Sequence, residues 1–412
     1  MTRVVVTGMG TLNPIGNSVA ESWENVVNGV SGVGPITLFD ASDLLVQIAA
    51  EVKNFDPVQH MEAREARRQD RFEQLAAAAS QEAVEQSGLQ IEPANAARVA
   101  VIISSATGGL SSLEHGITEM NAEGPRRVSP FLIPMYMSNG AAGLVAIHFG
   151  AKGPAFSVAS ACASGADGIG QAWGLIRAGV VDSALAGASD SSISKIGVSG
   201  FDRLGAMSRR NDDYSMTPAP FDKDRDGLVM GEGAAVLILE SLEHATARGA
   251  EVLAEMVGYS STSDAFHITA PAEDGAGGSA AIAGALQMAG INAEQVDYIN
   301  AHGTATGLND VSETRAIKAA LGEAAYDIPI SSTKSMTGHM MGATGALEAI
   351  FCVQAIRDGV VPPTIHLQTP DPECDLDYIP NEARRRPVRV ALSNAFGFGG
   401  HNAVLAFRAF SG

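Results

Sequence analysis

The sequence predicts an α/β protein built from two packed halves, and three observations support this fold class. The chain has 412 residues, 46% hydrophobic and 18% charged, a balance typical of globular proteins. Since one hydrophobic core stops growing at roughly 250 to 300 residues, this length favours two halves. Short β-branched segments alternate with alanine-rich amphipathic ones, which is typical of a mostly parallel or mixed sheet covered by helices. The third observation is an internal repeat.

Six short segments rich in β-branched residues have the pattern of buried strands. They are residues 4–8, 99–104, 181–188, 298–301, 328–332 and 388–393. The segments between them are predicted helices, because their apolar residues recur at helical spacing.

The internal repeat has a spacing of 180 residues. The segment LIRAGVV, which starts at Leu175, returns as AIRDGVV at Ala355. With the same offset CASGA, starting at Cys162, lies over GATGA, starting at Gly342. A chance match of short segments is the alternative, but both ends of one predicted helix repeat in the same register. This agreement favours duplication of a structural unit.

A charged stretch at residues 240–251 separates the two copies of the repeat. Domain boundaries fall in exposed polar segments that few contacts cross. We therefore predict an N-terminal half, residues 1–250, that carries the single cysteine of the first copy. The C-terminal half is then residues 251–412, and we expect both halves to have similar topology.

Charge and composition exclude several kinds of partner. The chain has 27 Lys and Arg against 46 Asp and Glu, a net charge of −19 that repels nucleic-acid phosphates and anionic lipids. No segment approaches the roughly 20 apolar residues of a membrane helix, and no signal-peptide pattern stands at the N-terminus. Three cysteines without a CxxC pair indicate neither a disulfide framework nor a zinc site. We expect a soluble, cytoplasmic protein with no nucleic-acid or membrane partner and no metal.

Cys162 stands in SVASACASGADGIG, where a β-prone segment gives way to a turn of small residues and then a helix. At a helix start the unsatisfied N–H groups and the dipole favour a thiolate, so we expect a thiol pKa below about 8.5. A small buried apolar cysteine is the alternative, and it is our interpretation of Cys352. The small neighbours of Cys162 leave the turn open to a substrate, which favours a nucleophile.

Two histidines follow predicted strands in glycine-rich turns, His302 in NAHGTATGLND and His339 in SSTKSMTGHMMGATG, with Lys334 five residues before the second. Active sites of α/β proteins gather at such junctions. A lone histidine is more often structural, but this group indicates partners for a nucleophile. In SNAFGFGGHN three glycines allow peptide N–H groups to face an oxyanion while Phe398 covers the site, and a glycine-rich hairpin is the alternative.

Six ordered motifs together resemble a known family, the β-ketoacyl-[acyl-carrier-protein] synthases of the elongating type, and most closely synthase II. They are VTGMG, SACASG, PFDKDRDGLVMGEG, NAHGTAT, SSTKSMTGHMMGATGA and NAFGFGGHN. The resemblance spans nearly the whole chain. It implies the thiolase fold, in which two duplicated α/β halves form a five-layered α-β-α-β-α molecule that usually forms a homodimer.

The resemblance also implies a mechanism. Cys162 would take an acyl chain from acyl carrier protein, and malonyl-carrier protein would then bind. His302 and His339, as neutral imidazoles, would stabilise the enolate formed when malonyl loses CO₂. The carbanion would attack the acyl-cysteine and give a 3-oxoacyl chain two carbons longer. No dissociable cofactor is implied, because phosphopantetheine arrives on the carrier protein.

Supporting residues follow from the same resemblance. Lys334 would organise His339 together with an acidic partner, for which Glu313 is the first candidate and Asp310 the second. A buried structural ion pair is the alternative interpretation of these groups. The backbone N–H groups of Cys162 and Phe398 match the oxyanion hole.

Three further positions concern the substrate. Phe398 matches the aromatic residue that gates the site, and Thr304 and Thr306 match threonines that bind the phosphopantetheine arm. Thr107 stands where synthase II members often carry a branched apolar residue that lines the acyl pocket. The preferred acyl length is therefore left open.

Seven arginines predict a local basic patch for an acidic carrier protein. Four of them recur at i, i+3, i+4 and i+7, on one face of a predicted helix, and three match docking positions of the family. They are Arg64, Arg67, Arg68 and Arg71, and Arg126, Arg127 and Arg210. A solvated charged face is the alternative for each one.

The fold that the resemblance implies also serves other functions. A thiolase needs a second cysteine near the C-terminal turn, and residues 396–402 contain none. A non-catalytic partner subunit that shapes chain length is disfavoured, because Cys162, His302, Lys334 and His339 are all present. A ketosynthase of a polyketide pathway remains the alternative to fatty acid elongation.

Overall fold

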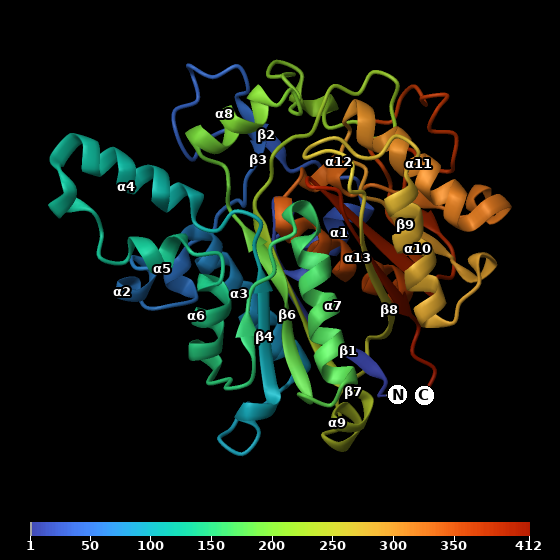
Figure 1. Ribbon diagram of the computed structural model, residues 1–412, viewed down its shortest axis with the longest axis horizontal. Helices are drawn as coiled ribbons and strands as arrows, with labels where there is room; N and C mark the ends of the chain where they lie inside the picture. The colour runs from blue at the N-terminus through green and yellow to red at the C-terminus, as the bar shows by residue number, and fades with distance from the viewer. Residues whose placement is uncertain (1) are drawn as a thin grey trace.

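The computed structural model describes residues 2–412 and is dominated by one ten-stranded sheet (Figure 1). Its strands are β1 (Val4–Leu12), β4 (Val99–Ser104), β5 (Ala155–Phe156), β6 (Ser183–Asp190), β7 (Gly233–Ser241), β8 (Ala254–Ser263), β9 (Tyr298–Asn300), β10 (Ile330–Ser331), β13 (Val390–Gly397) and β14 (His401–Arg408). Two small hairpins pair β2 (Val33–Pro35) with β3 (Ile48–Ala50), and β11 (Val360–Val361) with β12 (Arg384–Arg385).

The ten strands divide into two sets of five with the same topology. The order is β1-β7-β6-β4-β5 in the first set and β8-β14-β13-β9-β10 in the second. Counted along the chain, the first strand of each set pairs antiparallel with the fifth, and the fifth pairs antiparallel with the fourth. The fourth strand pairs parallel with the second, and the second pairs parallel with the third. This shared topology confirms the predicted duplication. The domain boundary near residue 250 stays a prediction, because β1 and β8 pair antiparallel across it and join the two sets.

Helices cover both outer faces and fill the space between the two sets. The α-helices are α1 (Val19–Val27), α2 (Ala63–Ala66), α3 (Arg71–Ser87), α4 (Leu110–Glu123), α5 (Leu132–Tyr136), α6 (Gly140–Phe149), α7 (Ser164–Arg177), α8 (Lys195–Arg203), α9 (Leu242–Ala247), α10 (Ala276–Ala289), α11 (Gly307–Leu321), α12 (Lys334–Thr337) and α13 (Thr344–Asp358).

The layers follow the predicted α-β-α-β-α order. Helices α3 and α6 pack on the first set of strands, and α10 packs on the second with α11 against it. Helices α7 and α13 lie between the sets and contact strands of both (Figure 1). Cys352, in α13, is fully buried in this central layer, as predicted. Within residues 2–412, no helix combines the length and the apolar character that crossing a bilayer requires.

The two central helices are related by the 180-residue repeat. Each begins after a short 3₁₀ turn whose first residue has a left-handed backbone, Ala161 with φ 51° and Met341 with φ 48°. A Cβ on Gly165 would lie 2.5 Å from the carbonyl oxygen of Gly342. Because only glycine permits this approach, the starts of α7 and α13 come together at the centre of the molecule.

Candidate active site

Cys162 lies in the 3₁₀ turn Ala161–Ala163, which leads directly into α7. The residue is 8% exposed. The β13–β14 hairpin, which contains SNAFGFGGHN, packs against this turn so closely that a Cβ on Gly397 would lie 3.0 Å from the nitrogen of Cys162. The glycine-rich segment is therefore a hairpin, as one interpretation of the sequence holds. It also lies over the cysteine, as the other interpretation requires.

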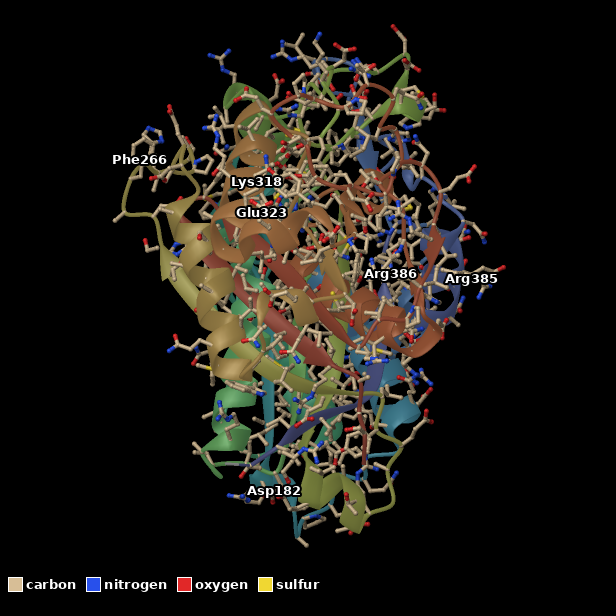
Figure 2. The ribbon with its side chains drawn as sticks, turned by 90° about the vertical axis from the view of Figure 1, so that its right-hand side faces the viewer. Asp182, Phe266, Lys318, Glu323, Arg385 and Arg386 are labelled. Atoms are coloured by element: carbon tan, nitrogen blue, oxygen red, sulfur yellow. The ribbon has the colours of Figure 1, made fainter. Side chains whose placement is uncertain are left out.

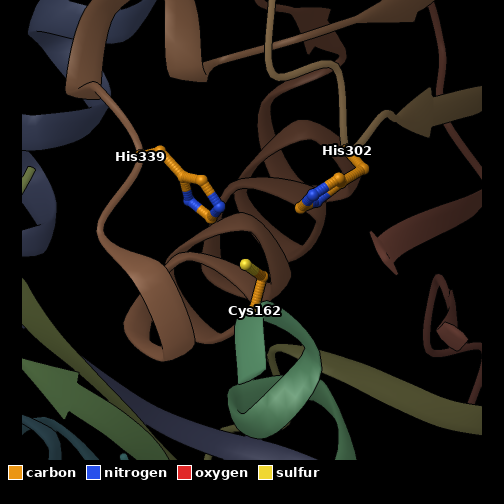
Figure 3. Close-up of side chains that lie close together, drawn as sticks. All are labelled: Cys162, His302 and His339. Carbon is orange, nitrogen blue, oxygen red and sulfur yellow. The ribbon is translucent and has the colours of Figure 1, made fainter. Parts of the chain in front are cut away.

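Both candidate histidines face the cysteine from the second half of the chain (Figure 3). His302 follows β9, and His339 follows α12. One ring nitrogen of each and the sulfur of Cys162 all lie within 4.8 Å of one another. The two rings are 5.4 Å apart between centroids and nearly perpendicular, at 84°. The Nδ1 atom of His339 contacts the hydroxyl of Thr344 at 3.1 Å, which leaves its Nε2 for a substrate.

Burial sets the protonation of the three groups. Desolvation, with the nearby charge of Lys334, holds the pKa values of His302 and His339 well below 6.5, so both imidazoles are neutral at neutral pH. Desolvation raises the pKa of the Cys162 thiol to about 11, although the Phe398 N–H and Lys334 act in the opposite direction. The expected lowering of the thiol pKa is wrong for the free protein, because burial outweighs the helix start.

Lys334 and Glu348 form a buried ion pair, with Nζ 2.6 Å from Oε1 and each side chain 1% exposed. The assignment of Glu313 as the partner of Lys334 is therefore wrong. Glu313 accepts hydrogen bonds from the backbone N–H groups of His302 at 2.8 Å and Gly303 at 2.7 Å, and so holds the histidine turn. A signal for Glu348 was present, since it is a lone charge in the apolar segment ALEAIFCVQAI.

Asp310 is likewise not a partner of Lys334. It is fully buried in α11, accepts the backbone N–H of Phe221 at 2.8 Å and lies 3.7 Å from the Arg225 guanidinium. Arg225 also pairs with Asp371 at 2.6 Å. Asp310 therefore stabilises the loop around Phe221 and Arg225, near the residues of the site but not among them.

A cavity of about 250 Å³ leads to the sulfur. It is lined from both halves of the chain, and its lining includes Cys162, His302, His339, Thr304, Thr306 and Phe398. The Phe398 ring stacks on Phe201 with centroids 6.1 Å apart. The hydroxyls of Thr304 and Thr306 are 2.9 Å apart, and both residues line the cavity together with exposed Leu308.

The backbone N–H groups of Phe398 and Cys162 both act on the Cys162 sulfur, where they favour its negative charge. They are the two donors expected for an oxyanion hole. Thr107, in contrast, does not line this cavity. Its hydroxyl contacts Asp190 at 3.0 Å and Ser192 at 2.7 Å, because the loop after β4 is tied to the end of β6.

One group of side chains among the described residues has the chemistry of a metal site. Cys162, His302 and His339 offer the sulfur and nitrogen ligands that zinc prefers, and all three are buried.

The first group of arginines does not lie on one helix face. Helix α2 ends at Ala66, and α3 begins at Arg71 behind a capping box formed by Asp70 and Glu73. Arg71 turns inward and pairs with Glu232 at 2.7 Å. Because the Asp70 cap breaks the expected helix, only Arg64, Arg67 and Arg68 remain exposed.

Part of the second group lies next to the first. Helices α2 and α5 are side by side in Figure 1, and the Arg68 guanidinium lies 4.5 Å from the Phe131 ring at the start of α5. Arg126 and Arg127 are exposed in the 3₁₀ turn just before it. Arg127 and Arg210 are each paired with a carboxylate, Arg127 with Glu123 at 2.8 Å and Arg210 with Asp226 at 3.4 Å. Backbone carbonyls also accept from the Arg210 guanidinium, and its part in docking stays a prediction.

Comparisons with known proteins agree with this geometry. Residues 1–245 match the family model for the N-terminal domain of beta-ketoacyl synthases, and residues 253–368 match that for the C-terminal domain. The chain is 52% identical to a 3-oxoacyl-[acyl-carrier-protein] synthase 2 of Synechocystis sp., over 99% of this chain and 98% of that protein. It is 49% identical to the Staphylococcus aureus protein of the same name, over the same shares of both chains.

A solved structure extends the likeness to three dimensions. It is a type II polyketide ketosynthase in complex with its acyl carrier protein, with a TM-score of 0.91, 36% identity and full coverage of both chains. Both family models cover most of the chain, and about half of its residues are identical to those of full-length relatives. The chain therefore belongs to the β-ketoacyl synthase family and is an acyltransferase of the condensing type.

Proposed function

We propose that this chain condenses an acyl group held on Cys162 with malonyl-[acyl-carrier protein], in the elongation of fatty acids. One observation carries this proposal: a thiol and two neutral imidazoles from opposite halves meet within 4.8 Å at the end of a cavity. The identity of 52% to a synthase 2 supports elongation over the polyketide alternative, whose solved ketosynthase is 36% identical.

The first step transfers the acyl group. The Cys162 sulfur attacks the thioester carbonyl, and the tetrahedral oxyanion accepts hydrogen bonds from the N–H groups of Cys162 and Phe398. The thiol proton passes to a neighbouring neutral imidazole, which offsets the high pKa of the buried thiol. That proton then goes to the departing phosphopantetheine sulfur. The products are an acyl-cysteine and the free carrier thiol.

The second step forms the carbon–carbon bond. Malonyl-carrier protein loses CO₂, and the electron pair of the broken bond becomes an enolate whose oxygen accepts hydrogen bonds from His302 and His339. The enolate carbon attacks the acyl-cysteine carbonyl, and the tetrahedral intermediate expels the Cys162 sulfur as a thiolate. The thiolate then takes up a proton from solvent, because the original thiol proton left with the free carrier thiol in the first step. The product is a 3-oxoacyl chain, two carbons longer, on the carrier protein. We propose that no dissociable cofactor takes part.

The partners follow from the surface. An acidic carrier protein suits the exposed arginines around α2 and α5, and Thr304 and Thr306 suit its phosphopantetheine arm. A homodimer is supported by the open edge of β5 and by exposed apolar residues nearby, including Ile133 (63% exposed) and Ile147 (79%). We place the reaction in the cytoplasm, which suits three unpaired cysteines.

Charge reversal at the basic patch tests the docking of the carrier protein. Arg67→Glu combined with Arg68→Glu is expected to raise KM for acyl-carrier substrates about tenfold, because rim charges steer association. Reaction with a small acyl thioester should be unchanged. The matched control is Arg385→Glu with Arg389→Glu, since both side chains are exposed and Arg385 lies at the surface of a different face (Figure 2). Equal KM values for the two double variants would remove the docking assignment.

The pH profile of condensation tests the protonation states. Both imidazoles have pKa values held well below 6.5, so they stay neutral at pH 6.5 and above and take up protons only as the pH falls further. A protonated ring accepts no proton from the thiol. We therefore expect the acid limb of kcat to lie below pH 6.5. An acid limb at pH 6.5 or higher would contradict the neutral-imidazole assignment.

The activity itself is tested by the products. We expect a panel of acyl-carrier proteins, mixed with malonyl-carrier protein and the enzyme, to yield 3-oxoacyl products that are each two carbons longer. Mass spectrometry of the carrier-bound products identifies them and gives the preferred acyl length. Repeated extension to poly-3-oxo chains would favour the polyketide alternative, and transfer without carbon–carbon bond formation would overturn both.

A further inference from the structure

Asp167 is a buried carboxylate in the first turn of α7 that the proposed reaction does not use. It is 6% exposed and lies five residues after Cys162. Its Oδ2 accepts the hydroxyl of Ser160 at 2.5 Å, and its Oδ1 accepts the hydroxyl of Tyr259 at 2.7 Å. Ser160 belongs to the turn that carries the cysteine, whereas Tyr259 belongs to β8 in the second set of strands.

The contact between Tyr259 and α7 depends on a glycine. A Cβ on Gly170 would lie 2.5 Å from carbons of the Tyr259 ring, so any other residue would push the ring away. Burial and the nearby Asp167 carboxylate raise the pKa of Tyr259, which keeps its hydroxyl protonated as a donor. Through Asp167 and Gly170, helix α7 of the first half therefore packs against Tyr259 of the second half and is hydrogen-bonded to it.

Ser160 connects this set to the backbone of the cysteine turn. Its N–H donates to the Ser164 hydroxyl at 2.9 Å, and that hydroxyl donates to the carbonyl of Ala161 at 2.6 Å. Ala161 has φ 51°, a conformation that a non-glycine residue keeps only where its surroundings hold it. The Ser160 hydroxyl is therefore a support on one side of a strained residue that directly precedes Cys162.

We propose that Asp167 and Tyr259 are positioning residues that hold the cysteine turn in its reactive geometry. The hydroxyl of Tyr259 holds one carboxylate oxygen of Asp167, and the other oxygen holds the hydroxyl of Ser160. These contacts keep Ala161 in its left-handed backbone conformation. The sulfur and the N–H of Cys162 then point at the substrate carbonyl. Both carboxylate oxygens of Asp167 are taken up by the hydroxyls of Ser160 and Tyr259, so Asp167 acts on the sulfur through the turn.

The test compares four variants by two measurements, kcat for condensation and the rate of Cys162 alkylation. Only the measurement of kcat rests on the proposed function. Asp167→Ala is expected to lower kcat about tenfold or more with KM unchanged, because small displacements of a reacting atom are costly. Asp167→Asn keeps an acceptor for Tyr259 and a partner for Ser160, so it should stay within about threefold of the parent. Tyr259→Phe should lie between them.

Tyr378→Phe is the matched control, because its buried hydroxyl bonds Thr314 and does not touch α7. It should lower the melting temperature while kcat per folded molecule is unchanged. The second readout is the rate at which iodoacetamide alkylates Cys162, followed by mass spectrometry of its peptide. We expect this rate to fall in Asp167→Ala and Tyr259→Phe but not in Tyr378→Phe.

Three outcomes separate the possibilities. Parental kcat and alkylation in Asp167→Ala would overturn the proposal, as would losses in all variants, Tyr378→Phe included, that follow the melting temperature. If Asp167→Ala does not fold, kcat and the alkylation rate are measured in Tyr259→Phe and Ser160→Ala instead, and parental values in both would overturn the proposal. If no variant or parent condenses substrates but the alkylation pattern holds, positioning stands and the proposed function fails.

Discussion

Cys162→Gln is expected to keep the decarboxylation of malonyl-carrier protein and to lose condensation completely. The neutral amide of glutamine places a carbonyl where the acyl group of the acyl-enzyme would lie, and His302 and His339 remain to stabilise the enolate. Cys162→Ala removes the nucleophile without this replacement, so acyl transfer to the enzyme should disappear. We expect condensation to fall by about 10⁴-fold or more in both variants. Release of CO₂ and formation of 3-oxoacyl product are measured in parallel.

Cys374→Ala is the control for removal of a thiol, because Cys374 is buried outside the cavity. It should keep both decarboxylation and condensation. Acylation that persists in Cys162→Ala would refute the assignment of the nucleophile. Loss of decarboxylation in Cys162→Gln, with the fold intact, would mean that the sulfur itself takes part in that step.

His302→Ala and His339→Ala are each expected to reduce condensation by about 10² to 10³-fold, the cost of removing one oxyanion donor. Both rings are neutral and face the sulfur. Each substitution therefore removes one hydrogen bond to the enolate oxygen, and this bond strengthens as the enolate forms. Acyl transfer to Cys162 should be affected less than decarboxylation. The double variant should lose less than the product of the two single effects, because residues that act as a unit are not additive.

The control for these variants is His366→Ala. His366 is also a buried histidine whose pKa burial lowers, but its Nδ1 contacts the carbonyl of Pro218 and the ring does not line the cavity. It should keep the parental rate per folded molecule. A parental rate of decarboxylation in either His302→Ala or His339→Ala would contradict the proposed role of that imidazole.

Much of the fold follows from local sequence. Six strands were predicted because β-branched residues concentrate in them, and the repeat predicted the duplication. Strand β7 was missed because its alanine-rich start is typical of a helix and its end falls in the charged stretch 240–251. Glu240 is in fact buried there, held by Arg248 and Thr7. A single sequence does not reveal such a partner across the sheet.

Some properties of the site also follow from local sequence, and others do not. Cys162, His302 and His339 were recognisable because each stands in a turn of small residues, and such turns meet at one place in the fold. The thiol pKa was not predictable, because it depends on burial by the opposite half of the chain. Arg71 was also misinterpreted, since its partner Glu232 lies far away in sequence. Tertiary contacts decide both properties.

The most direct test of the account is the mass of the peptide that contains Cys162. After incubation with an acyl-carrier protein, we predict that this peptide carries the acyl group. After malonyl-carrier protein is added, the acyl group should leave the peptide and appear in a carrier-bound 3-oxoacyl chain two carbons longer. Formation of that product with the acyl group on another residue, or with no acyl-enzyme at all, would contradict the account.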